Sequence, residues 1–210
     1  MGGLIRRLRG DRRGVAALEA ALIFPIAVII LVGFTEMYFY MRAVNIVERT
    51  SVTVADLLAR RQTLLDCAQT TDSAYLGTYF HIGEIVAQPL VMATNGQIVA
   101  AAVIDTGAGP TIAWQRRSPF SVDTGSPIGT DGAAAKLPVT TVAVPNPALN
   151  GDTLIVASVA YRFRPFEGVR VLLPSLPGEV MIVRTAYARA RFGALGALPG
   201  QPGCTASPSL

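Results

Sequence analysis

Two Asp-Thr-Gly triplets are the residues of this chain best suited to chemistry, because a pair of aspartates can share a proton and activate a water molecule. The first begins at Asp105, directly after the apolar run Val-Ala-Ala-Ala-Val-Ile, and the second begins at Asp123. Proteases that use such a pair place one triplet in each of two lobes, whereas these copies are only 18 positions apart. Asp-Thr-Gly is also ordinary turn chemistry, so we interpret both triplets as turns.

The other residue types that serve in catalysis do not gather in the sequence. His81 is the only histidine, and no cysteine or carboxylate cluster with metal-ligand spacing accompanies it. The sequence has no Walker A loop, no dinucleotide-binding glycine fingerprint and no Gly-x-Ser-x-Gly elbow. We therefore expect no enzyme, no metal site and no cofactor.

The two cysteines, Cys67 and Cys204, enclose most of the chain beyond its N-terminal third. In an oxidising compartment they would be able to form a disulfide that holds the Gly/Pro-rich C-terminal tail. Closing so long a loop contributes about 4–5 kcal/mol at most. Two free thiols are the alternative that the residues alone leave open.

The net charge of +4 belongs entirely to the first 14 residues, which hold five arginines and one aspartate. The rest of the chain is neutral overall but polarised: residues 65–152 carry seven acids and three bases, and residues 153–192 carry six arginines and two glutamates. Phosphate binding needs a spread-out basic face, which the net charge does not indicate. We therefore expect no nucleic-acid partner.

Residues 15–34 form an apolar run of 20 residues whose only charged member is Glu19. A helix with a rise of about 1.5 Å per residue spans roughly 30 Å over this length, which matches the hydrocarbon core of a bilayer. The preceding arginines predict a cytoplasmic N-terminus and an extracytoplasmic C-terminal region. No small-x-small cleavage site follows Phe34, so a retained anchor is favoured over a cleaved secretory signal. A core helix of a soluble protein is the alternative.

Glu19 stands in a recognisable setting. A carboxylate within an apolar span is costly unless it is near an end, protonated or paired; by itself, Glu19 would be close enough to the interface to reach it. However, the stretch from Arg12 to Tyr40 resembles the TadE/TadG-like family of the tight-adherence (Flp) pilus apparatus, and its beginning resembles the processing site of type IV prepilins. The residues that carry the resemblance are Arg12, Arg13, Gly14, Glu19, Pro25, Gly33 and Glu36.

That resemblance implies that a prepilin peptidase cuts between Gly14 and Val15. Gly14 has no side chain, so a protease could approach its backbone closely. Cleavage would free the α-amino group of Val15, and Glu19, one helical turn away, would pair with this ammonium in the same chain or in a neighbouring subunit. The implied partners are other pilin-like subunits and the pilus assembly platform. Pro25 would kink the helix.

Beyond the apolar run, residues 35–66 contain no Gly or Pro and carry apolar residues at helical spacing, which predicts a helical stalk. Two helices with a break near Gly33 are the alternative. A second helix is predicted at 73–87. Five strands are predicted at 97–104, 111–115, 139–144, 153–163 and 179–192, and the alternation around Tyr161 indicates a half-exposed strand.

The expected fold class is α+β, with a long N-terminal helix and a β-rich extracytoplasmic domain. The predicted parts are a basic leader at 1–14, a transmembrane helix at 15–34, a helical stalk at 35–66, an α+β domain at 67–192 and a tail at 193–210. The predicted function is that of a minor pilin of a bacterial inner membrane, which assembles an adhesive Flp or type IVb pilus or a tight-adherence secretion system. The alternative is an uncleaved, signal-anchored envelope protein whose β-rich domain binds a partner or a surface polymer.

Overall fold

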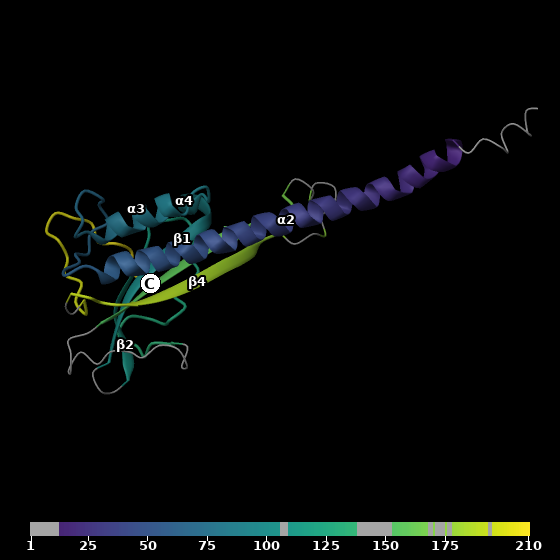
Figure 1. The fold of residues 1–210 in the computed structure, drawn as a ribbon. Helices are drawn as coiled ribbons and strands as arrows, with labels where there is room; N and C mark the ends of the chain where they lie inside the picture. Colours follow the sequence, from purple (N-terminus) through teal and green to yellow (C-terminus); the bar gives the residue numbers. More distant parts are fainter. Residues whose placement is uncertain are drawn as a thin grey trace, which may run out of the picture. The chain divides into compact units, whose positions relative to one another are not determined.

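The computed structural model describes residues 13–105, 109–137, 153–167, 170, 175, 178–192 and 195–210, without the side chains of residues 13, 14 and 16 (Figure 1). Residues 1–12 of the predicted leader and the predicted strand at 139–144 lie outside the described residues. The chain divides into two compact units, Met1–Met41 and Arg42–Leu210, and we call the second unit the head. An N-terminal apolar helix followed by an antiparallel sheet confirms the α+β class.

The first helix, α2, extends from Arg13 to Ala59 and runs through Gly33 without a break, which excludes the two-helix alternative. It ends seven residues before the predicted boundary at residue 66. The carbonyl of Ala59 accepts a hydrogen bond from the backbone N–H of Arg191, at 2.8 Å. Leu65 and Asp66 instead form parallel bridges with Tyr75 and Gly200, so this segment is extended chain rather than helix.

Within the described residues, four strands form one antiparallel sheet in the order β2-β1-β3-β4. Each lies within three residues of its predicted bounds. The strands are β1 (Gly96–Asp105), β2 (Pro110–Arg117), β3 (Leu154–Phe163) and β4 (Val180–Arg189). A bulge in the β1–β2 pairing falls between Ala102 and Val103. The central strands, β1 and β3, are mostly buried, whereas β2 and β4 lie at the two edges of the described sheet.

One face of the sheet is covered by the part of α2 within the head and by α3 (Leu76–Val86), beside which lies the single turn α4 (Met92–Asn95) (Figure 1). The predicted apolar stripe of α2 is confirmed as far as Leu58, since Val44, Val47, Ser51, Val54 and Leu58 are all buried. α3 begins three residues later than predicted. Its Gly83 lies between Val54 and Ile98, where an added Cβ would collide with the Ile98 side chain.

The helix-covered face is lined by small side chains. Ala100 of β1 lies opposite Ala157 of β3, which in turn lies opposite Ala186 of β4. Ala102 and Ala188 belong to the same face by the two-residue period of a strand. Alanines let a helix approach the sheet closely, and at the edge strand they leave space that a larger side chain would fill.

The other face packs against the long segment between β2 and residue 137. Ala101, Val103, Ile112, Leu154 and Val156 form a core with Ile128 of that segment. This covering corrects the prediction of a half-exposed β3, because its first seven residues are buried on both faces and only Tyr161, Arg162 and Phe163 are partly exposed.

Tyr79 of α3 is a buried titratable side chain, so it links the stability of the head to pH. Its ring is 1 % exposed, its hydroxyl donates a hydrogen bond to the carbonyl of Ser73 at 2.6 Å, and the Arg61 guanidinium lies 5.5 Å from its ring centroid. Burial raises the pKa of Tyr79, although Arg61 partly opposes that shift. Burial also raises the pKa of Tyr161 and Tyr187.

A folded-state pKa above the unfolded value means that the stabilisation is complete below about pH 10 and is lost as the pH rises through the folded pKa. We therefore predict that the free energy of unfolding of the head declines above about pH 10. Tyr79→Phe, which removes the hydroxyl, should cost about 1 kcal/mol at neutral pH and make the alkaline decline shallower. Denaturant titrations across pH test this. Tyr161→Phe is the control, and an equal loss at neutral pH in both variants would contradict the role of the Ser73 bond.

Candidate functional site

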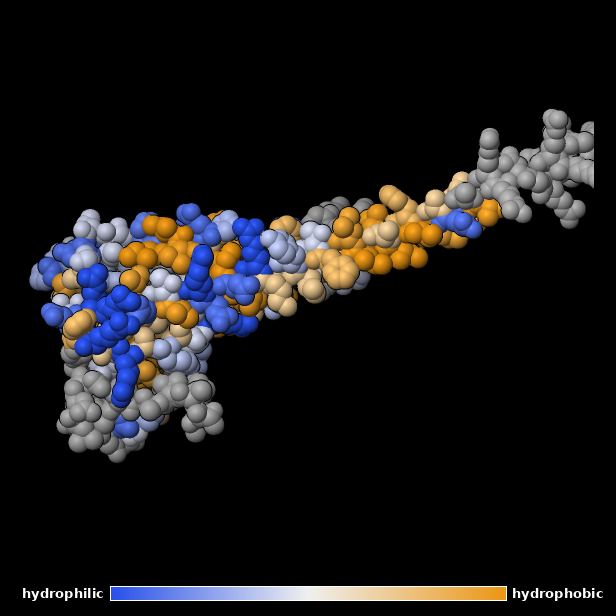
Figure 2. All heavy atoms as spheres, viewed as in Figure 1, coloured by the Kyte–Doolittle hydropathy of each residue, from blue (hydrophilic) through white to orange (hydrophobic). Residues whose placement is uncertain are grey.

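The apolar part of α2 before residue 42 is a continuous exposed surface (Figure 2). Its exposed side chains include Leu22, Phe24, Ile29, Leu31 and Phe34, which are 63 % to 70 % exposed. From Ala17 onward the helix is long and apolar enough to span a membrane, and no residue of its most apolar window is buried. A helix that packs into the core of a soluble protein would bury this surface, so it needs an apolar environment of another kind.

Glu19 is exposed on this helix, among apolar neighbours. Val15 lies four residues earlier, also exposed, and residues at this spacing share one helix face. Gly14 and Val15 belong to the first turn of α2, which begins at Arg13.

Pro25 lies inside α2, which continues on both sides of it. Proline has no N–H to donate to the carbonyl of Ala21, four residues earlier. Further along the helix, Thr35 adds a side-chain hydrogen bond, from its hydroxyl to the carbonyl of Leu31, at 2.8 Å. The carbonyl of Ala21, within the apolar surface, therefore lacks its usual hydrogen-bond donor.

Cys67 and Cys204 are joined in a disulfide with a Cα–Cα distance of 5.5 Å, across a sequence separation of 137 residues. The bond attaches the C-terminal tail to the segment that follows α2. Backbone hydrogen bonds flank it on both sides: the N–H of Asp66 donates to the carbonyl of Pro199 at 2.8 Å, and that of Ala68 donates to Thr205 at 2.9 Å.

Asp66 next to this disulfide holds a buried ion pair that sequence reasoning missed. Its side chain is 5 % exposed, and one carboxylate oxygen accepts a hydrogen bond from Nε of Arg116 at 2.7 Å. The other oxygen accepts from the N–H of Ser207 at 2.8 Å. Arg116 also reaches Asp131 at 3.2 Å. In the sequence, Asp66 is distinguished only by its position next to Cys67, and this does not indicate which basic residue it pairs with.

The two Asp-Thr-Gly triplets are not brought together. Asp105 ends β1, while Thr124, next to Asp123, hydrogen-bonds to Gln97 at the beginning of the same strand. At about 3.3 Å per residue, Gln97 and Asp105 lie roughly 26 Å apart along β1. Asp123 accepts a hydrogen bond from the N–H of Gly125, which is turn chemistry.

His81 and the described carboxylates form no metal site. His81 lies 3.4 Å from Glu84 on the surface of α3. Among the described residues, no group of three or more His, Cys, Asp or Glu side chains is placed to hold a metal ion.

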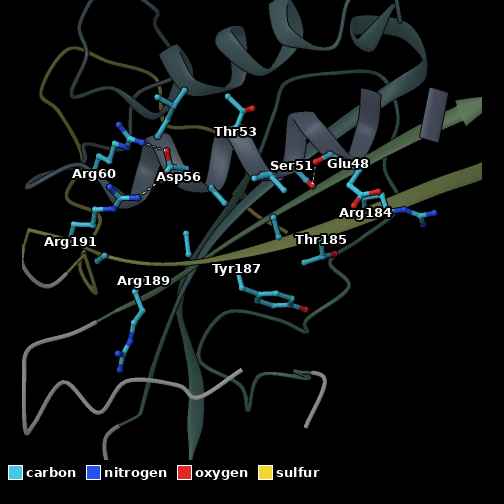
Figure 3. A pocket seen from close by; sticks show the side chains of 16 residues that line it. Glu48, Ser51, Thr53, Asp56, Arg60, Arg184, Thr185, Tyr187, Arg189 and Arg191 are labelled. Atoms are coloured by element: carbon cyan, nitrogen blue, oxygen red, sulfur yellow. Dashed lines mark hydrogen bonds and ion pairs between the residues drawn. The ribbon is translucent and has the colours of Figure 1, made fainter. Parts of the chain in front are cut away.

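A groove of about 910 Å³ lies between α2 and β4, from Glu48 to Arg60 on the helix side and from Arg184 to Arg191 on the strand side (Figure 3). Sequence reasoning missed it. At one end of the groove, Asp56 and Arg60 of α2, four residues apart, form an ion pair of 2.6 Å. Asp56 also holds Arg191 at 2.7 Å. At the other end lie Glu48 and Arg184 (Figure 3).

In comparisons with known proteins, no family model, no curated protein and no solved structure matches the chain. Function must therefore be argued from the residues and from the geometry described above.

Because Asp66 is buried and bonded from two directions, we predict that Asp66→Asn lowers the free energy of unfolding by about 3 kcal/mol. Asp131→Asn removes the exposed partner of the same arginine and should cost less than about 1 kcal/mol. Denaturant unfolding of the solubilised chain, with the disulfide intact, measures both. Equal losses would contradict the assignment of Asp66 as the principal partner of Arg116.

Proposed function

We propose that this chain is a pilin-like membrane protein, similar to the TadE/TadG-like minor pilins, that takes part in assembling an adhesive Flp or type IVb pilus or a tight-adherence secretion system. The observation that carries the proposal is the exposed apolar helix surface, on which Glu19 lies four residues after Val15. An uncovered surface of this size is stable in lipid or against other helices of the same kind.

The charge before the helix supports the orientation. Five arginines in the first 14 residues favour a cytoplasmic N-terminus, so the head would lie on the extracytoplasmic side of a bacterial inner membrane. The disulfide between Cys67 and Cys204 agrees with that side, because disulfides persist in oxidising compartments.

Processing between Gly14 and Val15 would suit the backbone there. Gly14 has no side chain, so a peptidase could approach its backbone closely. A prepilin peptidase at the membrane surface would then remove the whole basic leader and leave a neutral mature chain.

Glu19 would neutralise the new α-amino group of Val15. An ammonium at the edge of a bilayer needs an anionic partner, and the spacing of four residues offers one within the chain. When helices pack side by side, the Glu19 of one subunit would serve the Val15 of the next, which sets their register. Other pilin-like subunits and the assembly platform are the partners in this proposal.

The proposal predicts that the mature protein begins at Val15. Gly14→Leu should prevent cleavage, because a bulky side chain obstructs the close approach that glycine allows. Intact-mass measurement of membrane-extracted protein from cells that contain the peptidase is the test. An unprocessed wild-type chain would contradict the proposal and favour the alternative, an uncleaved, signal-anchored envelope protein.

The role of Glu19 is separable from processing. Glu19→Ala should still be cleaved, but at least tenfold less protein should leave the cell with sheared surface filaments, because an unpaired charge costs more than 1.4 kcal/mol per interface. Leu18→Ala, which removes only apolar surface from the adjacent position, is the matched control. The assembly role fails if Glu19→Ala enters the filament fraction as the wild type does.

A further inference from the structure

We propose that the groove between α2 and β4 binds an extended, acidic segment of another protein, which adds to the sheet as a fifth strand beside β4. This inference does not depend on the pilus assignment, since it rests on the groove in the head alone. Three observations carry it: an open strand edge, a floor of small residues and a surplus of arginine.

The open edge is that of β4, a ten-residue strand. β4 pairs with β3 on one side, and within the described part of the chain no strand pairs with its other side. An antiparallel strand turns every second N–H and C=O toward its free side. These groups form a template on which an added peptide gains backbone hydrogen bonds.

The shape of the groove suits a strand with small or medium side chains. Ala186 and Ala188 line it from β4, and both lie on the helix-covered face of the sheet. Val52 of α2 lines the opposite side and is 55 % exposed. A strand added about 4.8 Å from β4 would cover these three side chains, and an apolar residue at every second position would occupy the space that the alanines leave.

The net positive charge of the groove favours an acidic partner. Three arginines, Arg60, Arg184 and Arg191, line it on the side of α2 with two carboxylates, Glu48 and Asp56, whereas Arg189 points to the other side of β4 (Figure 3). Asp56 is already held by two of the arginines, at 2.6 and 2.7 Å. The remaining surplus of one positive charge favours a peptide that carries Asp or Glu.

The same charges argue against a second copy of this chain. Residues 180–192, which include β4, contain three arginines and no acid, so two β4 edges would bring like charges together. Basic residues on an edge strand are a known protection against self-pairing. An acidic strand from a different protein meets no such repulsion.

A direct test uses a set of three ten-residue peptides with alternating Val/Thr and polar positions, in which the polar positions are Glu/Asp, Gln/Asn or Lys. Binding to the detergent-solubilised full chain, measured by fluorescence anisotropy, should favour the acidic peptide over its amide counterpart by about tenfold. N-methylation of alternate amides of the acidic peptide, in the register that faces β4, should abolish its binding, because those N–H groups make the strand pairing.

Charge variants locate the binding site. Arg184→Glu should weaken binding of the acidic peptide by about tenfold. Arg164→Glu, which makes the same charge change outside the groove, at a residue paired with Glu179, should leave the affinity within about twofold.

Four results would overturn the proposal: no binding of the acidic peptide, equal affinity for the acidic and amide peptides, binding that survives N-methylation, and equal weakening by both charge variants. Self-association of the wild-type chain that Arg184→Glu alters would replace it with an interface between copies.

Discussion

The head depends on one buried carboxylate, that of Asp66. It accepts hydrogen bonds from Arg116 of β2 and from the backbone of Ser207, and the disulfide of Cys67 begins at the next residue. Three parts of the chain that are far apart in sequence therefore meet at one point. A buried ion pair is stable only when each polar group is bonded, so the strand, the tail and the segment after α2 hold their positions together.

A second constraint is that α2 serves two environments. Before residue 42 its surface is large and apolar, as a bilayer or a bundle of like helices requires. Within the head the buried positions become small or β-branched, such as Val47, Ser51 and Val54, because the helix lies on a sheet face of alanines. Buried hydroxyls are satisfied within the helix: Thr50 and Ser51 donate to the carbonyls of Ile46 and Glu48.

Sequence reasoning predicted the parts that depend on local pattern. The apolar stripe from Val44 to Leu58 and the four described strands follow from residue spacing alone, because periods of 3.6 and 2 reflect which side faces the core. Prediction from the sequence failed where a contact with a residue distant in the chain determines the structure. The end of α2 at Ala59 depends on Arg191, and the burial of β3 on both faces depends on the segment that contains Ile128. Neither partner can be read from a window of neighbouring residues.

The sequence by itself predicted a long apolar helix with one acid near its beginning, a basic N-terminal segment and a β-rich domain, since hydropathy, charge and spacing act over short distances along the chain. Only the tertiary structure decided which acid is buried and which strand is left at the edge. Asp66 and Asp131 are both acids near turns in the sequence, yet only Asp66 lies where the tail closes over it. The groove beside β4 likewise exists because the order of the described strands, which depends on contacts across the whole head, places Ala186 and Ala188 on the outermost of them, beneath α2.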